Sequence, residues 1–149
     1  MKQKIIFSLL VLFLIGCSSS LDSEYFSVSL SSDVGTDSDP LIIAPINTST
    51  VSSLAKYSDK SLSFSVKPES SKIVEYSLLS VIGTNKSELP IEDFIFDVST
   101  KKIGVKQGSK FGPNWGASES EVVTLTIQAK NSKEELSDIS VKVLLKATK

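Results

Sequence analysis

The chain has 149 residues, with 16 basic residues, 17 acidic residues and no histidine. Every basic residue is a lysine, so neither imidazole nor guanidinium is present for acid–base chemistry, metal ligation or bidentate phosphate binding. The near-neutral balance and scattered lysines provide no concentrated basic surface, which excludes nucleic acid as an expected partner. The length predicts a single domain.

The first sixteen residues have the features of a secretory signal peptide. Lys2 and Lys4 supply positive charge, and Ile5 to Ile15 form an apolar run that only Ser8 interrupts. As a helix this run spans about 16 Å, well short of the roughly 30 Å hydrocarbon core of a bilayer. Its length favours a signal peptide over residues 1–16 rather than a transmembrane helix.

The apolar run ends in Leu14-Ile15-Gly16-Cys17, which contains the only cysteine of the chain. This ending resembles the lipobox of bacterial lipoproteins, where cleavage before the cysteine leaves its sulfur to carry a lipid. The resemblance implies that Cys17 carries a covalent lipid, with no other cofactor, and attaches the chain to a lipid membrane of the bacterial cell envelope. Ser18 favours the outer membrane where the cell has one. The alternative is a plain signal peptide in which Cys17 is incidental.

The mature chain begins with a short polar stretch, residues 17–23, that is typical of a flexible tether. The folded domain is then expected over residues 24–149. Apolar and polar residues alternate from Tyr25 to Leu30, as in a half-buried strand, and a turn-forming stretch precedes the apolar run Leu41 to Ile43. The span Asn47 to Asp59 is compatible with a helical turn or an edge strand.

The second half of the chain alternates more clearly. No segment has a sustained apolar stripe at helical spacing. Short alternating strands separated by turns about ten residues apart predict an all-β fold, a single antiparallel β-sandwich. The apolar residues expected to share the inner faces are Leu62, Phe64, Val66, Val74, Tyr76, Leu78, Phe94, Phe96, Ile103, Val105, Val123, Leu125, Ile127, Ala129, Ile139, Val141, Val143 and Leu145.

Four segments follow one another in a recognisable order: IVEYSLL at 73–79, DFIFDVSTKKIGV at 93–105, VTLTIQAKN at 123–131 and ISVKVLL at 139–145. This order resembles the cadherin-like branch of the immunoglobulin-like β-sandwiches. The resemblance implies the sandwich fold but not calcium-dependent homophilic adhesion. It does not extend to calcium, because Asn131 stands where the family has an aspartate and too few carboxylates align. No metal site is predicted.

The only tryptophan, Trp115, lies beside Asn114 in a loop with two glycines and a proline. One interpretation is an exposed indole that stacks on a sugar or anchors a protein partner, which makes Trp115 and Asn114 the candidate ligand-binding residues. The other interpretation is a tryptophan that folds back over the end of the core.

No catalytic residue is predicted. Glu88, Glu92 and Asp93 offer carboxylates near Pro90 that could in principle serve a hydrolase, but a polar loop is the simpler interpretation. The many serines have no evident base, since histidine is absent. The charged stretch Ser132 to Asp138 is expected to be a solvated hairpin between the last two strands.

Two functions follow for a chain that is not an enzyme. The first is a membrane-anchored binding or adhesion module that recognises a glycan or a protein through loops at one end of the domain. The second is a structural or accessory subunit of a cell-envelope complex, docked through an exposed strand edge.

Overall fold

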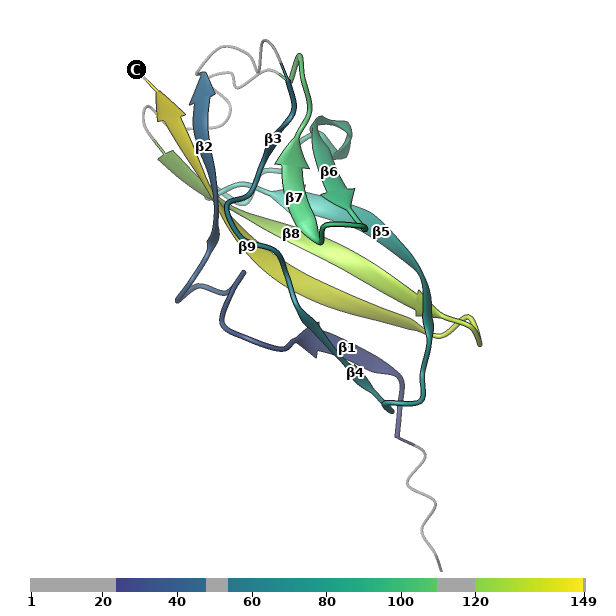
Figure 1. Ribbon diagram of the computed structural model, residues 1–149. Coiled ribbons are helices and arrows are strands. Elements are labelled where there is room, and N and C mark those ends of the chain that lie inside the picture. The colour runs from purple at the N-terminus through teal and green to yellow at the C-terminus, as the bar shows by residue number, and fades with distance from the viewer. Residues whose placement is uncertain (1–23, 48–53, 110–119, 149) are drawn as a thin grey trace, which may run out of the picture.

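The computed structural model describes residues 24–47, 54–109 and 120–148, and in these residues the fold is all-β (Figure 1). One 3-10 turn, η1 (Ile91–Asp93), interrupts the strands. The strands are β1 (Ser27–Leu30), β2 (Leu41–Asn47), β3 (Lys56–Tyr57), β4 (Phe64–Lys67), β5 (Ile73–Ile82), β6 (Phe94–Asp97), β7 (Lys102–Val105), β8 (Ser120–Asn131) and β9 (Leu136–Thr148).

Within the described ranges, the structure contains no helix long and apolar enough to cross a membrane.

The strands form three sheets. A four-stranded sheet has the order β2-β9-β8-β5, a three-stranded sheet has the order β3-β7-β6, and β1 pairs with β4 alone. The long hairpin of β8 and β9 forms the centre of the largest sheet. The expectation of purely antiparallel pairing is wrong at one place, because β2 runs parallel to β9, with Leu41 beside Val143. The chain reaches this edge by crossing from β1, which belongs to another sheet.

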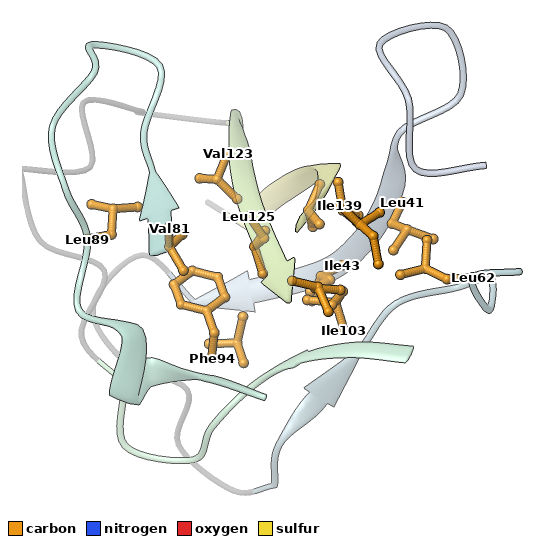
Figure 2. Packing of buried hydrophobic residues seen from close by; sticks show 14 of the residues in the cluster. Leu41, Ile43, Leu62, Val81, Leu89, Phe94, Ile103, Val123, Leu125 and Ile139 are labelled. Carbon is orange, nitrogen blue, oxygen red and sulfur yellow. The ribbon is translucent and has the colours of Figure 1, made fainter. Parts of the chain in front are cut away.

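The core lies where the inner faces of the sheets meet (Figure 2). Leu125 on β8 and Ile103 on β7 are fully buried, and Phe94 on β6 packs in the same cluster. Along β8 every second residue from Glu121 to Asn131 is buried, which confirms the predicted alternation. Thr124, on the outer face, instead accepts a hydrogen bond of 2.9 Å from Lys142 Nζ. Burial of each large apolar side chain contributes about 1.5–3 kcal/mol.

Strand β5 departs from the predicted alternation. Its pairing with β8 shifts between Ile73 and Glu75 and again between Leu78 and Ser80. These irregularities leave Val74 and Leu79 exposed, at 55% and 40%. The prediction that Val74 faces the core is therefore wrong, because an extra residue in one strand turns the following side chains to the other face.

The span left open between helix and edge strand contains the two-residue strand β3, at the edge of the three-stranded sheet. Residues 48–53 of that span lie outside the described ranges. Tyr57 packs against Gly104 of β7, where an added Cβ would lie 2.8 Å from the ring. A glycine is therefore needed for this close approach.

The molecule has two opposite ends along β8. The near end comprises the start of β1, the connection 68–72 and the hairpin Asn131 to Leu136; Ser132 N donates to Lys72 O at 3.1 Å, and Val28 N donates to Ser137 Oγ at 2.8 Å. The far end comprises the turn 83–88, η1, residues 106–109 and the start of β8. The 12 residues of β8 separate the two ends by about 40 Å.

Candidate functional site

The residues that the sequence singles out for lipid attachment and ligand binding, Cys17, Asn114 and Trp115, lie outside the described ranges. The described neighbours of the second pair are Ser109, which ends the segment 106–109, and Ser120, which begins β8, and both segments belong to the far end. Ser109 is buried, and its hydroxyl donates to Asp93 O at 3.3 Å. The far end is therefore the part of the fold to which the candidate loop is attached.

The far end contains a buried carboxylate that the sequence analysis missed. Glu121 is only 6% exposed, because it occupies the inward face of β8 one step before Val123. Its Oε1 accepts a hydrogen bond of 2.9 Å from the main-chain N of Thr84. Its Oε2 is buried and has no hydrogen-bond partner among the described residues. Such an orphaned atom is costly and requires an explanation.

The turn that holds Glu121 in place is itself tightly ordered. Gly83 N donates to Ser87 O at 2.9 Å, and Lys86, with φ of 62°, donates back to Gly83 O at 2.9 Å. Thr84 Oγ1 donates to Val122 O at 3.0 Å, which attaches the turn to β8. Asn85 Oδ1 accepts hydrogen bonds from both the N and the Oγ of Ser87.

Three side-chain oxygens converge beside Gly83. A Cβ at this glycine would lie 2.7 Å from Glu121 Oε1, 3.4 Å from Ser87 Oγ and 3.5 Å from Asn85 Oδ1. A Cβ at 2.7 Å would clash, so the close approach of the Glu121 carboxylate to this turn requires glycine. Glu121 precedes three buried apolar residues of β8, at distances of two, four and six residues. Because this alternation directs its side chain inward, it was the sequence signal that could have identified Glu121.

The three carboxylates considered for hydrolysis do not converge. Glu88 is exposed beside a small hollow of about 80 Å³, and Glu92 is exposed on η1. Asp93 is partly buried, and its main-chain O accepts from Lys106 N at 2.8 Å. Within the described part of the chain, no three acidic, cysteine or histidine side chains gather to hold a metal. The hollow is lined by Leu79, Ser80, Val81, Glu88, Leu89 and Ile91.

A partly buried aromatic cluster lies where the sheets adjoin. Phe64 of β4 stacks on Tyr76 of β5 with centroids 5.4 Å apart, and Phe96 of β6 meets both rings edge-on. Lys101 Nζ lies 4.4 Å from the centre of the Tyr76 ring, a cation–π contact. Partial burial lowers the pKa of Lys101 and raises that of Tyr76. The cluster binds three sheets together.

The turn between β6 and β7 explains the position of this lysine. Lys101 has φ of 56°, the left-handed conformation that glycine adopts most readily. Asp97 Oδ1 accepts hydrogen bonds from Ser99 N at 2.9 Å and Ser99 Oγ at 2.6 Å, with Thr100 N at 3.3 Å. These donors lower the pKa of Asp97 to about 2. These hydrogen bonds stabilise the turn locally.

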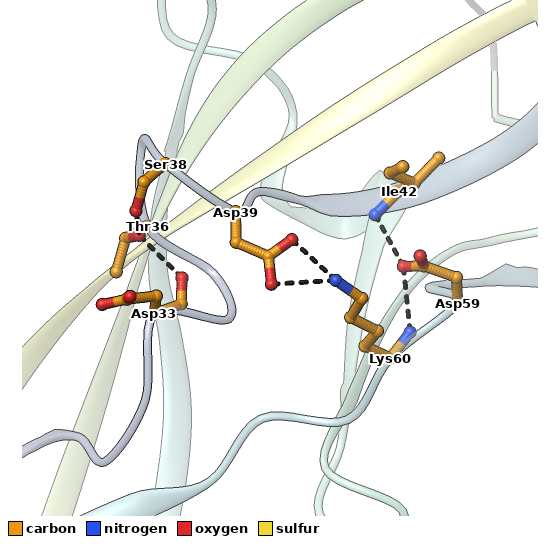
Figure 3. A network of polar contacts seen from close by, with 7 residues as sticks. All are labelled: Asp33, Thr36, Ser38, Asp39, Ile42, Asp59 and Lys60. Atoms are coloured by element: carbon orange, nitrogen blue, oxygen red, sulfur yellow. Dashed lines mark hydrogen bonds and ion pairs between the residues drawn. The ribbon is translucent and has the colours of Figure 1, made fainter.

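A polar network ties the loop between β1 and β2 to the segment after β3 (Figure 3). Lys60 Nζ bonds both carboxylate oxygens of Asp39, at 2.6 and 2.8 Å, and Asp59 Oδ1 accepts from Ile42 N at 2.9 Å. In the same loop, Thr36 Oγ1 bonds Ser38 Oγ at 2.8 Å and donates to Asp33 O at 2.6 Å. The carboxylates of Asp39 and Asp59 are both hydrogen-bonded within the protein, so we interpret the network as structural.

At the near end, the predicted hairpin between the last two strands is confirmed and is organised by Asn131. This residue is 2% exposed, and its Oδ1 accepts from Lys133 N and Glu135 N, both at 2.9 Å. Its Nδ2 donates to Glu135 Oε2 at 2.6 Å. The amide that stands where the cadherin-like pattern has an aspartate thus serves the turn.

The far end therefore offers one buried carboxylate, neutral oxygens beside it and a turn that positions them. No family model, curated protein or solved structure matches the chain.

Proposed function

We propose that this protein is a lipid-anchored, non-catalytic binding module of the bacterial cell envelope, held to a membrane through Cys17. Its ligand, a glycan or a protein, binds at the far end, through the loop that contains Asn114 and Trp115. The single observation that carries this proposal is the placement of the start of the described chain and of that loop's attachment points at opposite ends of the fold.

The geometry gives such a module a consistent orientation. Residues 17–23 reach at most about 25 Å when fully extended, so an anchor at Cys17 keeps the near end close to the bilayer. The far end then lies about 40 Å further out, because that is the length of β8. A ligand in the medium or on an opposing surface meets the far end first.

We infer in addition that the fold is an immunoglobulin-like, cadherin-like β-sandwich. The adjacency β5-β8-β9 in one sheet and β3-β7-β6 in the other supports this, since it corresponds to the C-F-G and B-E-D adjacencies of that fold. The apolar cluster shared by both sheets gives further support. In this fold, loops at one end of the sandwich commonly bind ligands.

The strand edges favour loop binding over docking through an edge. On β5, an edge strand of the four-stranded sheet, two register shifts interrupt the ladder, and Glu75 forms an ion pair with Lys130. Bulges and charges on an edge strand hinder its pairing with another chain. The alternative of an accessory subunit that docks by strand addition is therefore less well supported.

The experiment is crosslinking and capture from intact cells that express the full chain. The Cys17→Ser variant should lose palmitate labelling and leave the membrane fraction. Trp115→Ala should stay in the membrane but lose the crosslinked ligand.

The matched control is Tyr25→Ala, which removes an aromatic ring that is 87% exposed at the near end. It should capture the ligand as well as the wild type does. Retention of the ligand by Trp115→Ala, or its loss from Tyr25→Ala, would contradict binding at the far end.

A further inference from the structure

The small hollow at the far end lies where β5 meets the turn 83–88 and η1. Strand β5 forms one wall, and a register shift in its second half leaves Leu79 exposed beside the hollow. The segment 88–91 forms the other wall, and a hydrogen bond of 2.8 Å from Leu89 N to Val81 O holds it against β5. Bulges often re-aim a side chain beside a functional site.

The hollow has apolar walls and one charged group in its lining. Leu79 and Ile91 are 40% and 38% exposed, so a partner can reach both side chains. Glu88 is exposed, and within the described ranges its carboxylate takes part in none of the ion pairs, which join other residues. The Ser80 hydroxyl belongs to the same lining. Apolar walls beside an unpaired carboxylate complement a side chain with an alkyl stem and a cationic end.

The size of the hollow selects the kind of ligand. Its volume of about 80 Å³ is well below the roughly 300 Å³ at which pockets for small molecules begin. The hollow therefore accommodates part of one protein side chain rather than a glycan. Lysine fits best, because its stem is unbranched and its compact ammonium has three donors, for which Glu88 and the Ser80 hydroxyl offer acceptors.

We propose that this hollow receives a lysine side chain of a protein partner, with the stem packed on Leu79 and Ile91 and the ammonium bound to Glu88. The inference rests on the proposed function, from which it takes the far end as the binding end, and it selects a protein over a glycan as the ligand. An exposed ion pair contributes little affinity, so its main effect is to orient the partner.

The test is an NMR titration of the isotope-labelled full chain with n-butylammonium chloride, which has the stem and the charge of a lysine side chain, at constant ionic strength. The main-chain amide signals of Leu79, Val81 and Leu89 should shift saturably, with Kd on the order of 10 mM for so small a ligand. Butan-1-ol, which lacks the charge, should bind about threefold more weakly, as expected for an exposed ion pair. Ammonium chloride, which lacks the stem, should shift none of these signals.

Glu88→Gln should reduce the affinity for n-butylammonium to that for butan-1-ol. The matched control is Glu92→Gln, which removes an exposed carboxylate of η1 that does not line the hollow and should leave the affinity unchanged. The absence of saturable shifts, or equal affinities of the wild type and Glu88→Gln for n-butylammonium, would overturn the inference.

The capture experiment on intact cells separates this inference from the proposed function. Glu88→Gln should recover less of the crosslinked protein ligand than Glu92→Gln does. If Trp115→Ala loses the ligand while Glu88→Gln retains it in full, the proposed function stands and the lysine-binding hollow is disproved.

Discussion

The two ends of β8 differ in how completely they hydrogen-bond a buried polar side chain. Each end has a buried polar side chain on the inward face, Asn131 at 2% exposure and Glu121 at 6%. Asn131 has a partner at both ends of its amide, whereas Glu121 has a charged oxygen without one in the described chain. The near end thus satisfies its buried amide, while the far end leaves one buried carboxylate oxygen without a hydrogen-bond partner among the described residues.

The largest effect is expected midway between these ends. Leu125→Asp places a charge in the fully buried core and should abolish the cooperative thermal transition, because an isolated buried carboxylate costs more than the domain's stability. Thr124→Asp lies on the outer face and should melt cooperatively. Equal effects of the two variants in a calorimetric melt would disprove the assignment of faces, and with it the inward position of Glu121.

Asn131→Ala should destabilise the near end by about 2 kcal/mol, because it removes the acceptor for two main-chain N–H groups and the donor to Glu135. Urea denaturation measures this loss. Ser132→Ala, in the same hairpin but exposed, should change the free energy of unfolding very little. If both variants unfold at the same urea concentration, the amide does not organise the hairpin.

Gly83→Ala should destabilise the far end by about 1–2 kcal/mol, because its Cβ would lie 2.7 Å from Glu121 Oε1 and the turn must move. The comparison is Gly108→Ala, whose Cβ meets nothing within 4 Å although its φ is +81°. That variant measures the conformational cost alone. A smaller effect for Gly83→Ala than for Gly108→Ala would show that the space beside Gly83 is not confined.

The smallest effect on stability is expected at Asp97, a carboxylate that accepts hydrogen bonds from its own turn. Because the native pKa of Asp97 is about 2, below its ordinary 3.8, the group adds stability above pH 3.8 and loses it as the pH falls towards 2. The difference in Tm between wild type and Asp97→Asn should therefore shrink over that interval. Ser99→Ala removes the hydroxyl donor and should move the interval upward; an unchanged difference from pH 5 to 2 would contradict the assignment.

Much of the fold follows from local pattern. On β8 and β9 the alternation correctly predicts the buried apolar residues, because both strands pair without irregularity. On β5 the same rule fails at Val74, since the register shifts arise from pairing with β8, which a single segment does not reveal. The direction of β2 is likewise set by its partner, so the parallel pair with β9 was not predicted.

The contacts of Glu121 at the far end were not predicted, for two physical reasons. Glu121 lies in a polar stretch of the sequence, which suggests exposure to solvent. Its even spacing from Leu125, however, indicates that its side chain faces the core. The oxygens of Asn85 and Ser87 belong to a turn that meets β8 only in three dimensions. The contact of Lys101 with Tyr76 depends on the packing of separate sheets, which the sequence of a single segment does not reveal.

The parallel pair of β2 and β9 has a consequence for how the chain acquires its structure. Strand β2 begins at Leu41, yet its only sheet neighbour is formed by the 13 residues Leu136–Thr148. Pairings between such distant parts of a sequence fold slowly, because a long loop must close before any contact forms. Strand β2 therefore lacks its described sheet neighbour until β9 has been synthesised, so this edge of the sheet forms late.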